Sequence, residues 1–160
     1  MTKEEEIQDL LIKKFNFLEN KIRIQRQKRI FAEVPYENFL EVFEYAAKDL
    51  GFKFICTITG LDEGANLAFI YHVTRQEGIT LNLKITVAKE RPVIKTVTQI
   101  FPGADIYERE VMDLLGVKVE GLPAGKRYPL PDDWPAGEYP LRKDWKKPEK
   151  EKGKEETQNA

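Results

Sequence analysis

The sequence predicts one α+β domain, with helices on one face of a single sheet, followed by a short helix and an extended C-terminal arm. Apolar residues recur at helical spacing near the start of the chain and again after Pro35, whereas other segments alternate apolar and polar residues. Prolines then crowd the region after Gly121. A chain of 160 residues holds one hydrophobic core and leaves little room for a second. We therefore divide it into an α+β body, a helical region, an arm and a charged tail, at residues 1–92, 93–120, 121–145 and 146–160.

The first helix is expected from about Lys3 to Glu19. Thr2 followed by Glu5 has the form of a capping box, in which each side chain bonds the backbone N–H of the other residue. The apolar stripe of this helix consists of Ile7, Leu10, Leu11, Phe15 and Leu18. From Lys21 to Val34 the period changes to two around a polar break, which indicates a β-hairpin.

A second helix is expected to begin at Pro35, because the fixed φ of proline suits a first helical turn. Gly51 is a natural end for it, and its buried face should consist of Phe39, Leu40, Phe43, Ala46, Ala47 and Leu50. Three strands bounded by glycines follow near Phe52–Thr59, Asn66–Thr74 and Thr80–Ala88. The order helix, two strands, helix, three strands is typical of an α+β domain.

A third, short helix is expected from Ile106 to Leu115, with Gly116 as its end. Asp105 looks like its N-cap, with Glu108 at capping-box spacing. The residues expected on its apolar side are Tyr107, Val111, Leu114 and Leu115.

The charged face of this third helix allows two interpretations. Arg109 and Asp113 are four residues apart and are expected to form an exposed pair worth a few tenths of a kcal/mol. Glu108 would then be a cap, and Glu110 would interact with the positive end of the helix dipole. In the other interpretation the face docks on a partner, since an arginine fork can hold a carboxylate with two hydrogen bonds.

The arm after Gly121 contains prolines that forbid a long helix and interior strand pairing, at positions 123, 129, 131, 135 and 140. Lysine, glutamate, asparagine and glutamine dominate the tail, which predicts disorder over about the last dozen residues.

Composition excludes several classes of function. The 26 basic and 27 acidic residues give a net charge of −1, which argues against a dedicated nucleic-acid binder. Aromatic and basic residues interleave in the arm, but nearby acids cancel the positive charge, so protein docking is favoured over nucleic-acid stacking. No signal-peptide pattern or membrane-length apolar window is found, which favours a cytoplasmic protein.

The two lone reactive residues are expected to be structural. His72 is the only histidine, and one imidazole without a cysteine or second histidine makes no typical transition-metal site. We expect it to be a sheet residue bonded to a neighbour. Cys56 is the only cysteine, which excludes an internal disulfide or a cysteine-ligated cluster held within this chain. Its alternation with apolar neighbours predicts a buried, inert thiol.

Nearly forty residues, from Glu108 to Trp145, follow a spaced pattern that resembles a known signature. That signature is Glu-Arg-Glu, two variable residues, an acidic residue, two apolar residues, Gly and an aliphatic residue. It is matched by Glu108, Arg109, Glu110, Asp113, Leu114, Leu115, Gly116 and Val117. The match continues through Lys126-Arg127, Pro131-Asp132-Asp133-Trp134 and Pro140-Leu141-Arg142-Lys143-Asp144-Trp145. On these motifs the chain resembles the thirty-kilodalton-type subunit, also called the C subunit, of complex I-like respiratory NADH dehydrogenases and membrane-bound energy-converting hydrogenases.

This resemblance implies a non-redox subunit of a hydrophilic arm, which docks and positions a catalytic large subunit and is not an enzyme by itself. The implied partners are a large subunit related to the nickel-iron hydrogenase catalytic subunit and a small iron–sulfur subunit. Iron–sulfur clusters, and nickel-iron in the hydrogenase branch, would belong to those partners, with no cofactor or metal on this chain. The protein would lie in the cytoplasm at the inner face of the cell membrane, held there through its complex. The implied partner-binding residues are Glu108, Arg109, Glu110, Asp113, Lys126, Arg127, Trp134, Arg142, Lys143 and Trp145.

The sequence also departs from the family pattern. Ile106 replaces an aromatic residue, Leu122 a histidine, and Tyr128-Pro129 aliphatic residues. A role tied to that histidine is therefore not expected here. These departures slightly favour the hydrogenase-type branch, with the C subunit of a NADH:quinone oxidoreductase as the alternative. An independent adaptor and a free-standing enzyme are alternatives of other classes.

Overall fold

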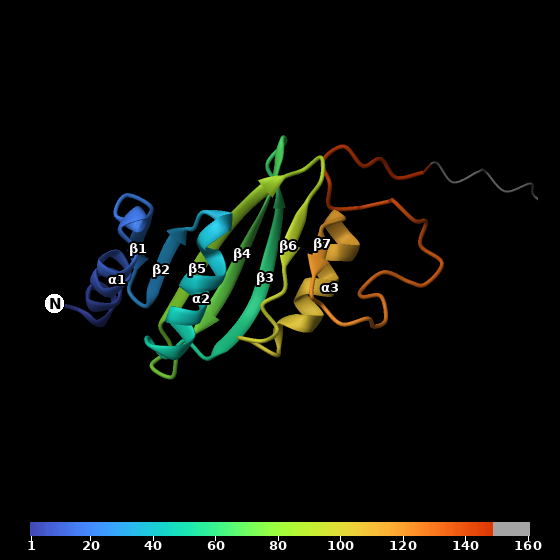
Figure 1. The fold of residues 1–160 in the computed structure, drawn as a ribbon. Helices are drawn as coiled ribbons and strands as arrows, with labels where there is room; N and C mark the ends of the chain where they lie inside the picture. Colours follow the sequence, from blue (N-terminus) through green and yellow to red (C-terminus); the bar gives the residue numbers. More distant parts are fainter. Residues whose placement is uncertain (149–160) are drawn as a thin grey trace, which may run out of the picture.

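The structure is a computed structural model that describes residues 1–148. Figure 1 shows one large sheet with α1 and α2 beside it, α3 near β3, and the arm beyond α3. The disorder predicted for the last dozen residues lies outside the described residues. The elements, in chain order, are α1 (Lys3–Lys14), a 3₁₀ turn (Asn16–Leu18), β1 (Ile22–Arg26), β2 (Arg29–Glu33), a second 3₁₀ turn (Tyr36–Asn38), α2 (Phe39–Lys48), β3 (Phe54–Asp62), β4 (Asn66–Thr74), β5 (Thr80–Ala88), β6 (Val93–Lys95), α3 (Ala104–Leu115) and β7 (Lys118–Glu120).

The large sheet has five strands in the order β1-β2-β5-β4-β3. β2 and β5 run parallel, while the other neighbours are antiparallel. The register places Ala32, Leu83 and Tyr71 across from one another on one face, where all three are buried. Helical side chains complete the core on this face, so the predicted α+β fold with helices on one side of the sheet is confirmed.

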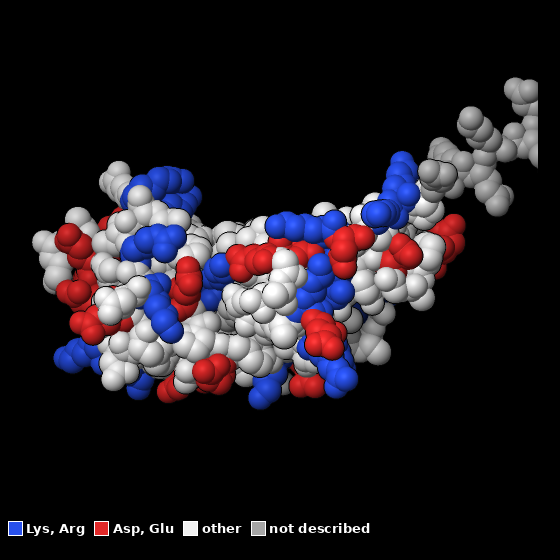
Figure 2. Space-filling model, turned by 90° about the horizontal axis from the view of Figure 1, so that it is seen from above, with Lys and Arg blue, Asp and Glu red and all other residues white. Residues whose placement is uncertain are grey.

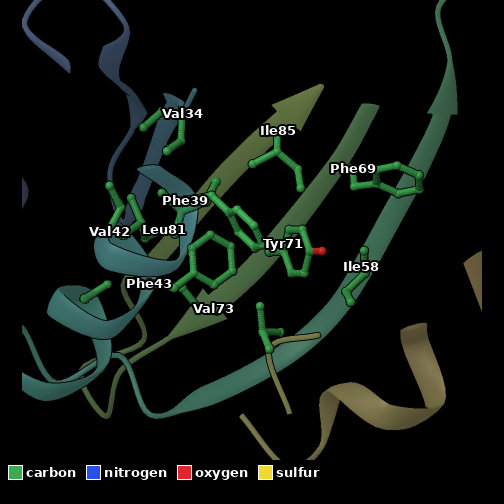
Figure 3. Close-up of a cluster of buried hydrophobic side chains, with 14 of the residues drawn as sticks. Val34, Phe39, Val42, Phe43, Ile58, Phe69, Tyr71, Val73, Leu81 and Ile85 are labelled. Atoms are coloured by element: carbon green, nitrogen blue, oxygen red, sulfur yellow. The ribbon is translucent and has the colours of Figure 1, made fainter. Parts of the chain in front are cut away.

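Aromatic rings make the centre of the core (Figure 3). The ring of Phe43 meets those of Tyr71 and Phe39 edge-on, with centroids 4.8 Å and 5.5 Å away. Full burial of one such ring stabilises the fold by about 1.5–3 kcal/mol. The same cluster includes Phe101 and Leu115, so residues beyond position 92 share the core of the body.

The first helix is shorter than expected. The capping box is present, since the Glu5 N–H donates to the Thr2 hydroxyl and the Thr2 N–H donates to the Glu5 carboxylate. The helix nevertheless ends at Lys14. Phe15 leaves the helical conformation, with φ −130° and ψ 84°, and its buried ring packs edge-on against Tyr45 at 5.5 Å.

A bulge in β3 makes the expectation for Cys56 wrong. The register shifts between Ile55 and Thr57, which leaves Cys56 as the extra residue on the bulged strand. Its thiol is exposed, and so is Phe54 before it, whereas Ile58 after the bulge is buried. Simple alternation cannot anticipate a bulge, because one inserted residue reverses the faces.

His72 lies on the sheet face opposite the core and links three strands. Its Nε2 lies 2.8 Å from the Thr59 hydroxyl and its Nδ1 2.6 Å from the Asn82 side-chain oxygen. Asn82 donates its amide to the Ile30 carbonyl at 2.9 Å, so its oxygen is the acceptor for His72 Nδ1–H. The prediction of a hydrogen-bonded sheet histidine is confirmed.

A small parallel sheet was not anticipated from the sequence. β6 and β7 pair over three positions, and α3 is the connection between them. Ile94 and Val119 at its centre are buried in the common core. The chain therefore continues from Arg91-Pro92 into further regular structure that fixes both ends of α3.

Candidate docking site on the third helix and the arm

Glu108 anchors α3 in the body. The N-cap is Gly103, which makes no side-chain cap bond, so the expected capping box of Asp105 and Glu108 is wrong. Glu108 is instead 0 % exposed. One carboxylate oxygen accepts the Thr96 hydroxyl at 2.6 Å, and the other accepts the Val97 N–H at 2.7 Å. Burial raises the pKa of this carboxyl, an effect that the two hydrogen bonds oppose.

Arg109 contacts the start of the arm rather than Asp113. Its Nε and Nη2 donate to the two oxygens of Asp105 at 2.8 Å and 3.0 Å, and this bonding lowers the pKa of Asp105. Nη2 also donates to the Pro123 carbonyl at 2.7 Å. A Cβ on Gly125 would lie 2.7 Å from the guanidinium carbon, so the arm backbone passes directly over Arg109. The expected pair with Asp113 is wrong because the helix offers a second carboxylate four residues earlier.

Asp113 holds the middle of the arm. Its side chain is 10 % exposed and accepts Arg127 Nε at 2.7 Å and the Leu130 N–H at 2.9 Å. Arg127 Nη1 in turn donates to the Trp134 carbonyl at 3.0 Å. One carboxylate thus ties α3 to two parts of the arm.

The end of α3 receives the later part of the arm. Gly116 has the left-handed φ of 71° expected at a helix end, and any Cβ there would collide with the ring of Tyr139. The carbonyls of Leu114–Leu115 accept the Leu141 N–H at 3.0 Å and Arg142 Nε at 2.7 Å. Carbonyls that a helix end leaves unpaired are therefore satisfied by the arm.

The two tryptophans of the arm form one cluster. The ring centroids of Trp134 and Trp145 are 6.0 Å apart, and both indole N–H groups donate to Glu138, one to its carbonyl and one to its carboxylate. The arm therefore has a compact turn of its own.

Asp62, at the end of β3, fixes the last part of the arm, and sequence reasoning missed it. Its side chain is 1 % exposed and accepts Lys89 Nζ at 2.7 Å and the Lys143 N–H at 2.8 Å. Lys89 also pairs with Asp144 at 3.0 Å. Nothing in the sequence signals this contact, because 81 residues separate Asp62 from Lys143.

With this geometry in view, the comparisons with known proteins identify the family. The family described as "Respiratory-chain NADH dehydrogenase, 30 Kd subunit" matches residues 32–151. The chain belongs to this family.

Relatives of this chain occur in several oxidoreductase complexes. The C subunit of the NADH-quinone oxidoreductase of Moorella thermoacetica is 32% identical over 116 residues, covering 71% of this chain and 77% of that protein. Membrane-bound hydrogenase subunit beta of Pyrococcus furiosus is 31% identical over 126 residues, covering 75% and 72%. A chain in the structure of the membrane-bound sulfane sulfur reductase, an archaeal respiratory membrane complex, superposes with a TM-score of 0.79 and 28% identity, covering 91% of this chain and 86% of that one. These relatives are subunits of multi-subunit oxidoreductases.

Most residues predicted to bind a partner make contacts within the chain itself. The side chains of Arg109, Asp113 and Arg127 hold the arm on α3. Those of Trp134 and Trp145 form the aromatic cluster of the arm, and that of Arg142 bonds the end of α3. Glu108 is enclosed, so its carboxylate reaches a partner only if α3 leaves the core. Glu110 is half-buried, while Lys126 and Lys143 are exposed. For all ten residues, including the enclosed Glu108, partner binding stays a prediction.

Neither a metal cluster nor a membrane helix is evident in residues 1–148. That part of the chain contains no group of three or more His, Cys, Asp or Glu residues arranged to hold a metal ion. It also has no helix long and apolar enough to cross a membrane. On the face shown in Figure 2, acidic and basic groups are interspersed over body and arm.

Proposed function

We propose that this member of the family is a non-redox part of the hydrophilic arm of a complex I-like oxidoreductase, where it docks and positions the catalytic large subunit. One observation carries the proposal: Arg109 and Asp113 of the signature fix the arm on α3, yet apolar side chains on the outside of the arm are exposed to solvent. Tyr128 is 43 % exposed and Leu141 53 %. An arm ordered in advance loses less conformational entropy on binding, which favours affinity.

The proposed partners are a large subunit related to the nickel-iron hydrogenase catalytic subunit and a small iron–sulfur subunit. We assign the iron–sulfur clusters, and nickel-iron where it occurs, to those partners. The single cysteine and single histidine of this chain support that assignment. The protein would then be cytoplasmic and peripheral at the inner face of the cell membrane through its complex, with no nucleic acid bound.

We favour a membrane-bound hydrogenase or related complex. The similarity to the archaeal sulfane sulfur reductase, which covers 91% of this chain, and to the hydrogenase subunit of Pyrococcus furiosus supports this choice. The second candidate is the C subunit of a NADH:quinone oxidoreductase, which the similarity to the Moorella thermoacetica protein favours.

The test is affinity purification of the tagged chain from its native membrane in mild detergent, with identification of every co-purifying subunit. A large subunit of the nickel-iron hydrogenase type together with an iron–sulfur subunit is the expected result, and the other subunits would distinguish the two candidates. Recovery of the chain alone would contradict the docking role and favour an independent adaptor.

A further inference from the structure

Asp62 has an environment unusual for an acid at the end of a strand. Its nearly enclosed carboxylate accepts three donors: Lys89 Nζ at 2.7 Å, the Lys143 N–H at 2.8 Å and the Gly64 N–H at 2.9 Å. Only the last of these belongs to its own turn. The other two bring the end of β5 and the arm to the same carboxylate.

Lys89 extends the contact outward. Its ammonium group lies between Asp62 and Asp144, the second of which is 70 % exposed. The inner pair is shielded from water and salt, whereas the outer pair is screened. The Asp62–Lys89 pair therefore contributes more to the stability of this contact than the Lys89–Asp144 pair.

These bonds hold the end of the arm on the sheet. Among the described residues, they are the only hydrogen bonds that join residues 143–148 to the body. Figure 1 shows the arm passing beyond α3 and returning to the end of the large sheet. Trp145 follows directly after the bonded residues, so the Trp134–Trp145 cluster is located by the same contact.

We propose that Asp62 is the positioning residue of the arm: it fixes Lys143 and, through Lys89, Asp144, and so sets where the Trp134–Trp145 cluster is presented to the partner subunit. The role of Asp62 in fixing the arm does not depend on any partner. Its role in presenting the cluster to a partner subunit rests on the proposed docking function. If loss of Asp62 lowers the fraction of arms in the docked conformation to about a tenth, the apparent Kd for the partner rises about tenfold.

The chain supplies its own probe for this test, because its 2 tryptophans are both in the arm. Their fluorescence therefore reports the arm and not the body. In the purified full-length protein we would measure acrylamide quenching of this fluorescence and the exchange rate of the Lys143 amide. Asp62→Asn should raise the quenching and the exchange rate, while the circular dichroism spectrum of the protein, which reports its helices and strands, is unchanged.

Two further variants control the experiment. Lys89→Gln removes the ammonium group but leaves Asp62. It should raise the quenching and the Lys143 exchange rate less than Asp62→Asn does. This variant keeps the test decisive if Asp62→Asn fails to fold. Asp132→Asn removes an exposed arm carboxylate that has no ion pair within residues 1–148 and should change nothing. Quenching and Lys143 exchange that stay at the wild-type level in both Asp62→Asn and Lys89→Gln would overturn the proposal.

Co-purification with the large subunit distinguishes the role of Asp62 in fixing the arm from its role in partner binding. A looser arm with unchanged assembly would refute the role in partner binding and retain Asp62 as the anchor of the arm. A wild-type chain that recovers no partner would refute the docking function, while the fluorescence result still decides the role of Asp62.

Discussion

Asp113 on α3 and Arg127 in the arm, 14 residues apart, are joined by a carboxylate–guanidinium bond of 2.7 Å. The same carboxylate accepts the Leu130 N–H, so two separate bonds converge on one partly buried group. A charged hydrogen bond in such a place is stronger than an exposed ion pair.

Asp113→Asn and Arg127→Gln should each destabilise the protein, by about 1–3 kcal/mol for the more buried Asp113. The double variant should cost less than the sum, because both single changes remove one interaction. Urea unfolding of the four proteins measures this coupling. Asp133→Asn, an exposed acid of the arm, is the control. Additive losses would mean that the pair contributes no coupling energy.

Gly125→Ala should loosen the arm from α3. The new methyl group would lie 2.7 Å from the guanidinium carbon of Arg109, which two bonds to Asp105 and one to Pro123 hold in place. Either the arm or Arg109 must move. Gly103→Ala is the matched control, since its methyl group would meet Ile55 at an ordinary 3.5 Å. Tryptophan quenching should rise in the first variant only, and equal quenching in both would contradict the close approach.

Tyr71→Phe should be neutral or stabilising, although Tyr71 is at the centre of the core. Its hydroxyl is buried without a hydrogen-bond partner among the described residues, and removing an unsatisfied polar group relieves a desolvation cost of about 1–3 kcal/mol. Phe43→Leu, beside it, should instead lose about 1 kcal/mol or more of packing. Thermal unfolding compares the two. A Tyr71→Phe protein that unfolds well below wild type would show that the hydroxyl has a bonding role.

The sequence predicted the body well where local rules act alone. The capping box at Thr2 and the helix end at Gly116 both depend on residues within a few positions, and both are present. Alternation located β4 and β5 to the residue, since no bulge interrupts them. In β3 one extra residue at Cys56 reversed the expected face.

The candidate site was harder to predict because its contacts are long-range. Spacing allowed Arg109 to pair with either Asp105 or Asp113, and only the path of the arm decides between them. Glu108 had the spacing of a cap, but the short strand β6 brings Thr96 to it from elsewhere. A motif shows that residues belong together, while tertiary packing determines what each one contacts.

Glu108 should make stability fall as pH rises from mildly acid values. Its pKa in the folded protein is raised above the ordinary 4.5, chiefly by burial. The folded state therefore holds this proton more tightly than the unfolded state, and its contribution to stability is present below pH 4.5 and lost as pH rises through the raised pKa. The test measures unfolding free energies of wild type and Glu108→Gln in urea, from below pH 4.5 upward. Because glutamine does not titrate, the wild-type value should fall relative to the variant value as pH rises. A difference that is constant with pH would contradict the assignment.

Leu141→Arg tests the docking surface with the least disturbance of the fold. The side chain is 53 % exposed, and the bond to the Leu114 carbonyl uses only the backbone N–H of Leu141, so the arm should remain in place. A buried, unpaired arginine in an apolar contact costs several kcal/mol, so co-purification of the large subunit should be lost. Leu10→Arg, at a 38 % exposed position on α1, carries the same change away from the arm and should assemble normally. Equal recovery of the large subunit with both variants would place the interface elsewhere, whereas loss with both would show that added charge alone disrupts assembly.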